Sequence, residues 1–116
     1  MQKIALEKKE MNWDTKEKKQ LIAGILVLKN ADEAKRFLRD LMTPKEINEF
    51  GNRLEAAKLL SQDVQYNAII ENTGLSSSTI SRISKWLKGS LGGYRLILSR
   101  LHHNPSSLRK GLSSSL

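Results

Sequence analysis

The sequence contains no cysteine, only two prolines and few aromatic residues, which make up 5% of its 116 positions. A chain without cysteine can form no disulfide, no thiol nucleophile and no cysteine-ligated zinc site. No apolar run approaches the roughly 20 residues that a membrane-spanning helix needs, and the N-terminal residues lack the apolar core of a secretory signal. We therefore expect a cytoplasmic protein with no membrane partner.

Acidic residues are absent after Glu71. Up to that position the chain holds thirteen basic and twelve acidic residues, a balance of +1, whereas the rest holds seven basic residues and no acid, a balance of +7. A near-neutral segment followed by a purely cationic one is typical of a scaffold that carries a polyanion-binding surface. The alternative interpretation is a basic face that only keeps the protein soluble.

The composition predicts an all-α fold of about six helices. Hydrophobic residues make up 39% of the chain, and no stretch alternates polar and apolar residues between hairpin turns as strands do. Residues 1–15 are mixed and charged and are expected to form a flexible N-terminal arm. Residues 16–103 are expected to form one helical domain. The serine-rich residues 104–116 are expected to form a disordered tail.

The first helix is expected over residues 15–29 and is apolar around most of its circumference, with Leu21, Ile22, Ile25, Leu26, Val27 and Leu28. Such a helix must be buried on several sides, and a chain of this length has little material to surround it. We interpret the segment as the core of a dimer. The alternative is the central helix of a monomeric bundle.

Two helix starts are signalled by their first residues. Asn30 is followed three positions later by Glu33, and Thr43 is followed by Pro44 and by Glu46; both patterns match capping boxes. Helical spacing predicts one buried face on each of three helices. The helix after Asn30 has Ala34, Phe37, Leu38 and Leu41, the helix after Thr43 has Ile47, Phe50, Leu54 and Ala57, and a last helix from Tyr94 has Tyr94, Ile97, Leu98 and Leu101.

Residues 66–87, YNAIIENTGLSSSTISRISKWL, read as two short helices around a tight turn. Gly74 suits a bend that requires a positive φ. In the second helix Ile80, Ile83 and Leu87 repeat at helical spacing and predict a buried stripe, while the opposite face is polar and has no acid. The pattern favours a DNA-binding helix-turn-helix. An ordinary helical hairpin is the alternative.

The DNA contacts expected from this motif are hydroxyls at the front of the second helix and cations behind them. Hydroxyls can donate to or accept from base edges, lysines bind phosphate, and one of the serines at 76–78 is expected to cap the helix. The candidates are Asn67, Ser77, Ser78, Thr79, Ser81, Arg82, Lys85 and Lys88. No catalytic or metal site is expected, since the adjacent His102 and His103 point to different faces of a helix.

Three segments together resemble the Trp repressor superfamily and its YerC/YecD-like branch. They are LMTPKEINEFGNRLEAAKLL at 41–60, TGLSSSTISRI at 73–83 and GGY at 92–94. The resemblance implies an intertwined homodimer with two DNA-reading heads. It further implies a sequence-specific transcriptional regulator, in the first instance a repressor, that reads a palindromic operator in double-stranded DNA.

The resemblance also implies an effector pocket. Arg53 and Arg82 match the two arginines that hold tryptophan in Trp repressors, and Thr43 matches a threonine at the pocket border. The glycine of that pocket is replaced by Ile83. A branched side chain there fills the space that an indole needs, so we do not expect tryptophan as a corepressor and expect no cofactor.

A second function class remains open at this point. A dimeric ligand-sensing or interaction module could use the basic C-terminal half to bind RNA or a protein partner. Readers of single-stranded RNA stack bases on aromatic side chains, and the acid-free segment after Glu71 offers only Trp86 and Tyr94. Comparing the salt dependence of binding to duplex and to single-stranded nucleic acid separates the two interpretations.

Overall fold

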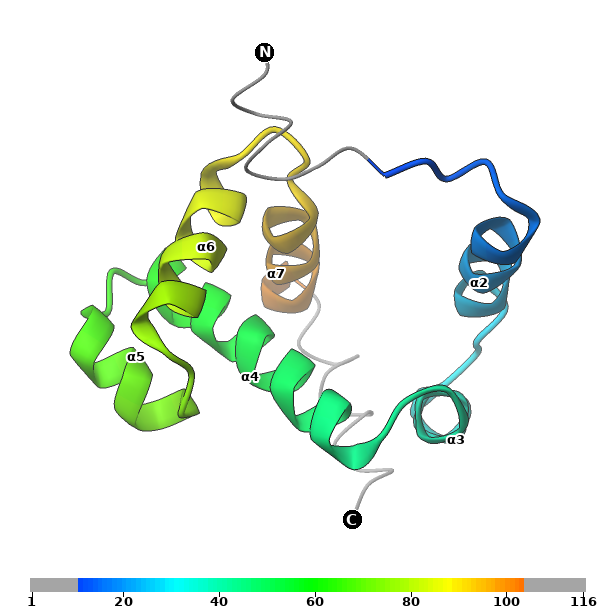
Figure 1. Cartoon of the computed structure of the whole chain (residues 1–116), viewed down its shortest axis with the longest axis horizontal. Coiled ribbons are helices and arrows are strands. Elements are labelled where there is room, and N and C mark those ends of the chain that lie inside the picture. The colour runs from blue at the N-terminus through cyan, green and yellow to red at the C-terminus, as the bar shows by residue number, and fades with distance from the viewer. Residues whose placement is uncertain (1–10, 104–116) are drawn as a thin grey trace.

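The computed structural model describes residues 11–103, so the first ten residues of the predicted arm and the predicted tail at 104–116 lie outside the described part. The described residues form six helices and no strand (Figure 1). The all-α prediction is confirmed. The helices are α2 (Lys16–Leu26), α3 (Ala31–Leu41), α4 (Pro44–Ser61), α5 (Tyr66–Thr73), α6 (Ser77–Lys88) and α7 (Gly93–His103).

The helices begin where the sequence supplies a capping side chain. The side chains of Thr15, Asn30, Thr43 and Ser76 each accept a hydrogen bond from a backbone N–H in the first turn of the helix that follows. At α4 the capping box is complete, because Glu46 also accepts from the backbone N–H of Thr43 at 2.9 Å. The two capping boxes in the sequence therefore mark real helix starts.

The turn between α5 and α6 is closed by Thr73 and Gly74. Gly74 has φ +71° and donates its backbone N–H to the carbonyl of Ile70 at 2.8 Å. The buried hydroxyl of Thr73 donates to the carbonyl of Ile69 at 2.7 Å and accepts from the N–H of Leu75 at 3.2 Å. The positive φ predicted for Gly74 is confirmed, and these bonds fix the angle between the two helices.

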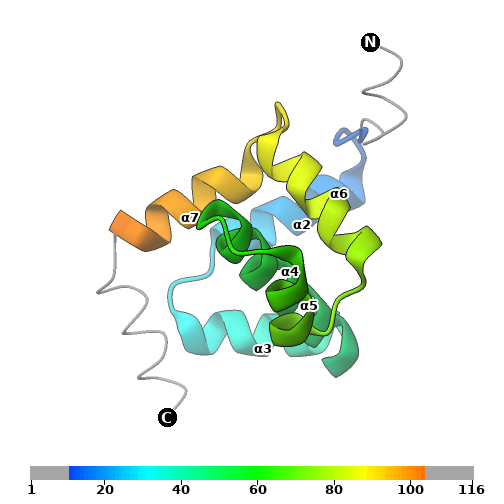
Figure 2. The same ribbon diagram turned by 90° about the vertical axis from the view of Figure 1, so that its left-hand side faces the viewer.

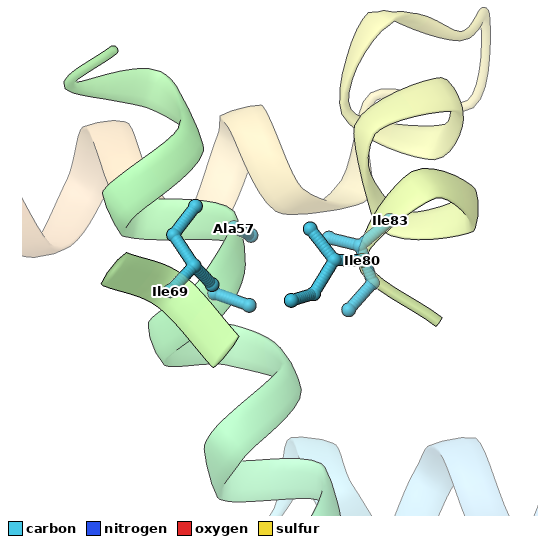
Figure 3. Packing of buried hydrophobic residues seen from close by; sticks show 5 residues of the cluster. Ala57, Ile69, Ile80 and Ile83 are labelled. Carbon is cyan, nitrogen blue, oxygen red and sulfur yellow. The ribbon is translucent and has the colours of Figure 1, made fainter. Parts of the chain in front are cut away.

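The core lies where α4, α5 and α6 meet. Figure 3 shows Ile69 of α5 and Ile80 and Ile83 of α6 gathered around Ala57 of α4. These three isoleucines are fully buried, as are Ala56 and Ala57. Burial of each isoleucine stabilises the fold by roughly 1.5–3 kcal/mol. The small alanines let α4 approach both helices closely, so the two-helix motif is held on a rigid support.

The helices α2, α3 and α7 have no fully buried residue. In Figure 1, α2 lies on the side of the molecule opposite α5 and α6. Leu26 is 78% exposed and Val27 69%. The buried faces predicted for α3, α4 and α7 are also partly wrong for a single chain. Leu38 and Leu41 of α3, Phe50 of α4 and Ile97 of α7 are exposed. The helices do not enclose α4 on all sides: α2 lies apart from the core in Figure 1, whereas α7 packs Tyr94 and Leu98 against it.

Two tight turns connect the two-helix motif of α5 and α6 to the helices before and after it, α4 and α7. Between α4 and α5, Asp63 adopts φ +61°, and the N–H of Val64 donates to the carbonyl of Leu59 at 3.0 Å. Between α6 and α7, the guanidinium of Arg95 donates to the backbone carbonyl of Leu87. Both junctions satisfy carbonyls that a helix C-terminus leaves without partners. They fix how the motif joins the flanking helices.

Candidate nucleic-acid interface

The second helix of the motif, α6, lies on an outer side of the molecule. Figure 2 shows this side, with α5 and α6 toward the viewer and α4 behind α5. The helix buries Ile80 and Ile83 against α4 and leaves its other face open. Leu87, the third residue of the predicted stripe, is half-buried. An apolar back and a polar front therefore coexist on α6 as its spacing predicted.

The eight predicted DNA contacts lie on α5 and α6, and their exposure differs. Six have exposed side chains: Asn67, Ser77, Ser78, Arg82, Lys85 and Lys88. Thr79 and Ser81 are half-buried. Because α6 and its two flanking turns contain no acidic residue, its open face is cationic. Lys85 and Lys88 lie in the last turn, where the helix dipole also favours positive charge.

Three hydroxyls at the start of α6 form a small hydrogen-bonded cluster. The hydroxyl oxygen of Ser76, the N-cap, accepts from the backbone N–H of Thr79 at 3.2 Å. The same hydroxyl donates to Oγ1 of Thr79 at 3.0 Å and lies 3.1 Å from Oγ of Ser78. Ser76 is thus the serine that caps the helix. Within the described residues, the hydroxyl of Ser77 makes no hydrogen bond to the protein.

Two of the four residues predicted for an effector pocket, Thr43 and Arg53, are engaged in other interactions. The hydroxyl of Thr43 accepts from the N–H of Glu46 and donates to its carboxylate, both at 3.1 Å. The guanidinium of Arg53 pairs with Glu49 at 2.7 Å, and its Cζ lies 5.7 Å from the centroid of the Phe50 ring. The carboxylate of Glu49 therefore already neutralises the arginine expected to face a ligand.

The other two predicted pocket residues, both on α6, differ in burial. Arg82 is exposed, whereas Ile83 is fully buried and contributes to the core. The Ile83 side chain thus fills space between α4 and α6 that a glycine would leave open. This packing supports the expectation that the position does not admit an indole.

Two groups near this region have shifted pKa values. Burial raises the pKa of Tyr94 above its ordinary value of 10.0, and the positive charge of Arg53 opposes that shift. The backbone N–H and then the hydroxyl of Thr43 lower the pKa of Glu46 below its ordinary value of 4.5. The positive charge of Arg53 therefore acts on Tyr94 across the fold, in the direction opposite to the effect of burial on the pKa of the phenol. Helical spacing does not predict this interaction, because the two residues are distant in the chain.

The described residues contain no group of three or more histidine, cysteine or acidic side chains placed to hold a metal. The rings of His102 and His103 meet edge to face, with centroids 5.2 Å apart. No helix of residues 11–103 is both long and apolar enough to span a membrane.

A rigid core beneath an exposed cationic second helix defines a helix-turn-helix protein. Residues 16–102 match the Trp repressor protein family, and the chain belongs to this family, whose members are regulatory DNA-binding proteins rather than enzymes. The chain is 40% identical over 86 residues to a protein of Bacillus subtilis (strain 168) named "Uncharacterized protein YerC". That match covers 74% of this chain and 83% of the relative.

A solved structure gives the same result. It is described as a TrpR like protein from Eubacterium eligens ATCC 27750, and it matches with a TM-score of 0.73 at 40% sequence identity. The match covers 78% of this chain and 93% of that chain. The predicted membership of the YerC-like branch of the Trp repressor superfamily is confirmed.

Proposed function

We propose that the protein is a sequence-specific regulator of transcription that binds double-stranded DNA as a homodimer and acts as a repressor. Each subunit inserts α6 into the major groove of one half of a palindromic operator. Its relatives come from bacteria, in which the chromosome lies in the cytoplasm, so we propose that the protein works there. The observation that carries the proposal is the exposed, acid-free face of α6 on a fully buried isoleucine back.

The charges around α6 support duplex DNA as the partner. Lys85 and Lys88 are exposed at the end of the helix, and exposed lysines bind backbone phosphates without reading sequence. The hydroxyls at the start of the helix are short side chains that can donate to or accept from base edges. The lysines at the C-terminal end of α6 therefore contribute affinity for any duplex, and the hydroxyls at its N-terminal end contribute sequence specificity.

The uncovered helices support the homodimer. Leu21, Ile22 and Ile25 are each at least 37% exposed, and Leu26 and Val27 are more exposed still. Exposed apolar residues on one helix that lie this close together mark an interaction surface. A second copy of the chain is the economical partner, since it offers the same uncovered face and a two-fold axis gives both subunits identical contacts. It also provides the two heads that a palindrome requires.

The experiment that tests the proposal is retention of fragmented genomic duplex DNA by the protein at low and moderate salt, followed by sequencing of the retained fragments. We expect a palindromic site whose retention weakens as salt rises. The variant with alanine at Ser78, Thr79 and Ser81 should lose that site while still retaining bulk DNA at low salt. Because this variant keeps Lys85 and Lys88, it tests the contacts to base edges separately from the contacts to phosphates.

Two outcomes would contradict the proposal. Retention without sequence preference would indicate a non-specific or architectural binder. No retention even at low salt would remove DNA as the partner and favour a dimeric interaction module for RNA or protein. Adding tryptophan to a parallel sample tests the effector: the buried Ile83 predicts no change in retention.

A further inference from the structure

Ser76 has no hydrogen-bonding capacity left for DNA. A serine hydroxyl has one hydrogen and two acceptor sites. The hydrogen points to Oγ1 of Thr79, and one acceptor site takes the backbone N–H of Thr79. The remaining acceptor site faces Oγ of Ser78 at 3.1 Å. Only one arrangement of hydrogens satisfies all three contacts, and in that arrangement Ser78 is the donor to Ser76.

This arrangement fixes what the two neighbouring hydroxyls can offer outward. The hydroxyl hydrogen of Ser78 is donated to Oγ of Ser76, so toward solvent the exposed oxygen of Ser78 can only accept. The oxygen of Thr79 accepts from Ser76, so its own hydrogen is left to donate. Ser77 is different, because a hydroxyl without a partner rotates and can act in either sense. The start of α6 therefore presents one fixed acceptor beside one fixed donor.

We propose that Ser78 and Thr79 together read one adenine in each half of the operator, with Ser76 as the residue that fixes their polarity. This inference rests on the proposed function. In the major groove only adenine carries a donor, its N6 amino group, next to an acceptor, its N7, on its own edge. The N6 amino group donates to Ser78, and the Thr79 hydroxyl donates to N7. The pair thus acts as the amide of asparagine or glutamine does in other readers.

The geometry is suited to this task. Both hydroxyls lie about 3 Å from the same oxygen, at 3.1 and 3.0 Å, so they are near enough to reach one base edge. Ser78 is exposed and Thr79 half-buried, and short side chains held in place lose little freedom on binding. The contacts come from side-chain oxygens on adjacent residues and use none of the N–H groups at the helix end.

The experiment pairs edited bases with edited side chains. Wild-type protein first selects its site from a random duplex library. Each adenine of the selected site is then replaced by 7-deazaadenine, which lacks the N7 acceptor, or by purine, which lacks the N6 amino group. Equilibrium binding is measured for wild type, Ser78→Ala and Thr79→Val. Two variants serve as matched controls: Thr79→Ser, which keeps the hydroxyl, and Ser99→Ala, at an exposed position of α7 outside the predicted contacts. Thermal melting verifies that every variant folds.

At one adenine per half-site, each edit should weaken wild-type binding about fivefold to tenfold, as expected for loss of one hydrogen bond. The loss of affinity caused by 7-deazaadenine should be absent in Thr79→Val, which has no hydroxyl to donate to N7. The same loss should persist in Ser78→Ala and Thr79→Ser. The purine effect should vanish in Ser78→Ala and persist in Thr79→Val. Ser99→Ala should lose binding to both edited sites by the same factors as wild type does.

Ser76 has its own test. Ser76→Gly keeps an acceptable N-cap but frees both hydroxyls, so it should broaden the selected base at this position while leaving the melting temperature nearly unchanged. Ser76→Thr keeps the hydroxyl and should restore the preference for adenine.

Three results would overturn the inference: a site without a preferred adenine, an edit that weakens every variant equally, or an unchanged base preference in Ser76→Gly. If wild type selects a palindromic site and Ser78→Ala and Thr79→Val bind that site as tightly as wild type does, the proposed function stands without the pair. Failure of wild type to select any site would overturn the proposed function and the pair with it.

Discussion

The guanidinium of Arg95 occupies the space where a side chain on Gly92 would begin. A Cβ at Gly92 would lie 2.9 Å from Nη2 of Arg95, closer than a Cβ atom comes to such a neighbour in real proteins. Gly92 also has φ +70°. From this position Arg95 donates to the carbonyl of Leu87 near the end of α6. The glycine at 92 therefore lets the turn form and lets α7 hold the end of the proposed reading helix.

Gly92→Ala should lower the free energy of unfolding by about 1–2 kcal/mol, because alanine is strained at a positive φ and its Cβ displaces Arg95. Gly93→Ala is the matched control, since nothing lies within 4 Å of a Cβ there, and it should be neutral within about 0.5 kcal/mol. Urea unfolding of the two variants at one protein concentration measures the difference. Equal stability of the two variants would contradict the role given to Gly92.

Truncation of Ile83 should be among the costliest changes in the chain. Its side chain is fully buried between α4 and α6, so Ile83→Ala leaves a cavity and should cost about 2–4 kcal/mol of stability. The half-buried neighbour Ser84 provides a control, and Ser84→Ala should stay within about 0.5 kcal/mol of wild type. Thermal and urea unfolding measure both. A loss below 1 kcal/mol for Ile83→Ala would mean that the site collapses or that the core lies elsewhere.

The capping box of α4 should contribute a pH-dependent part of the stability. Thr43 lowers the pKa of Glu46 by hydrogen bonding to its carboxylate. Because the folded-state pKa lies below the ordinary value of 4.5, the stabilisation is present above that pH and is lost as pH falls through the lowered pKa. Glu46→Gln keeps an acceptor oxygen but cannot ionise.

The stability difference between wild type and Glu46→Gln should therefore be largest near neutral pH and should shrink in acid. Urea unfolding at a series of pH values measures it. Glu55→Gln removes the same charge from an exposed position on α4 and controls for net charge. A difference that stays constant across the acid range would refute the coupling.

The proposed homodimer makes α2 sensitive to charge. Leu26→Glu should raise the dissociation constant of the dimer at least tenfold, because a carboxylate buried in an apolar interface without a partner is costly. Gln20→Glu adds the same charge at an exposed polar position of α2 and should leave assembly unchanged. Sedimentation equilibrium over a concentration series measures both. Wild-type protein that stays at the 13.1 kDa mass of one chain at high concentration would refute the dimer.

Local chemistry in the sequence predicted the helix starts and the turn. Thr43 and Glu46 cap α4, and Gly74 has the predicted positive φ. The buried positions Ile80 and Ile83 follow from helical spacing alone. These features depend on residues within one or two turns of each other, so a pattern along the chain is enough to find them.

Features that depend on tertiary packing were not predictable in the same way. Helical spacing placed Phe50 on a buried face, yet it is 49% exposed, because spacing names a face and does not say what covers it. Likewise, Arg95 reaches Leu87 across the turn through a side-chain conformation that no spacing rule supplies. The roles of Ser78 and Thr79 became distinct only when the hydrogen bonds of Ser76 were known.

The most direct test of DNA reading by α6 is equilibrium titration of two labelled duplexes, the selected site and a scrambled site, at several salt concentrations. Wild type should prefer the selected site. Lys88→Ala should weaken binding to both duplexes alike and reduce the salt dependence by about one phosphate contact per subunit. Ser78→Ala should weaken binding to the selected site only. Equal wild-type affinity for the two duplexes, or a salt dependence that Lys88→Ala leaves unchanged, would contradict the assignment of α6 as the DNA-reading helix.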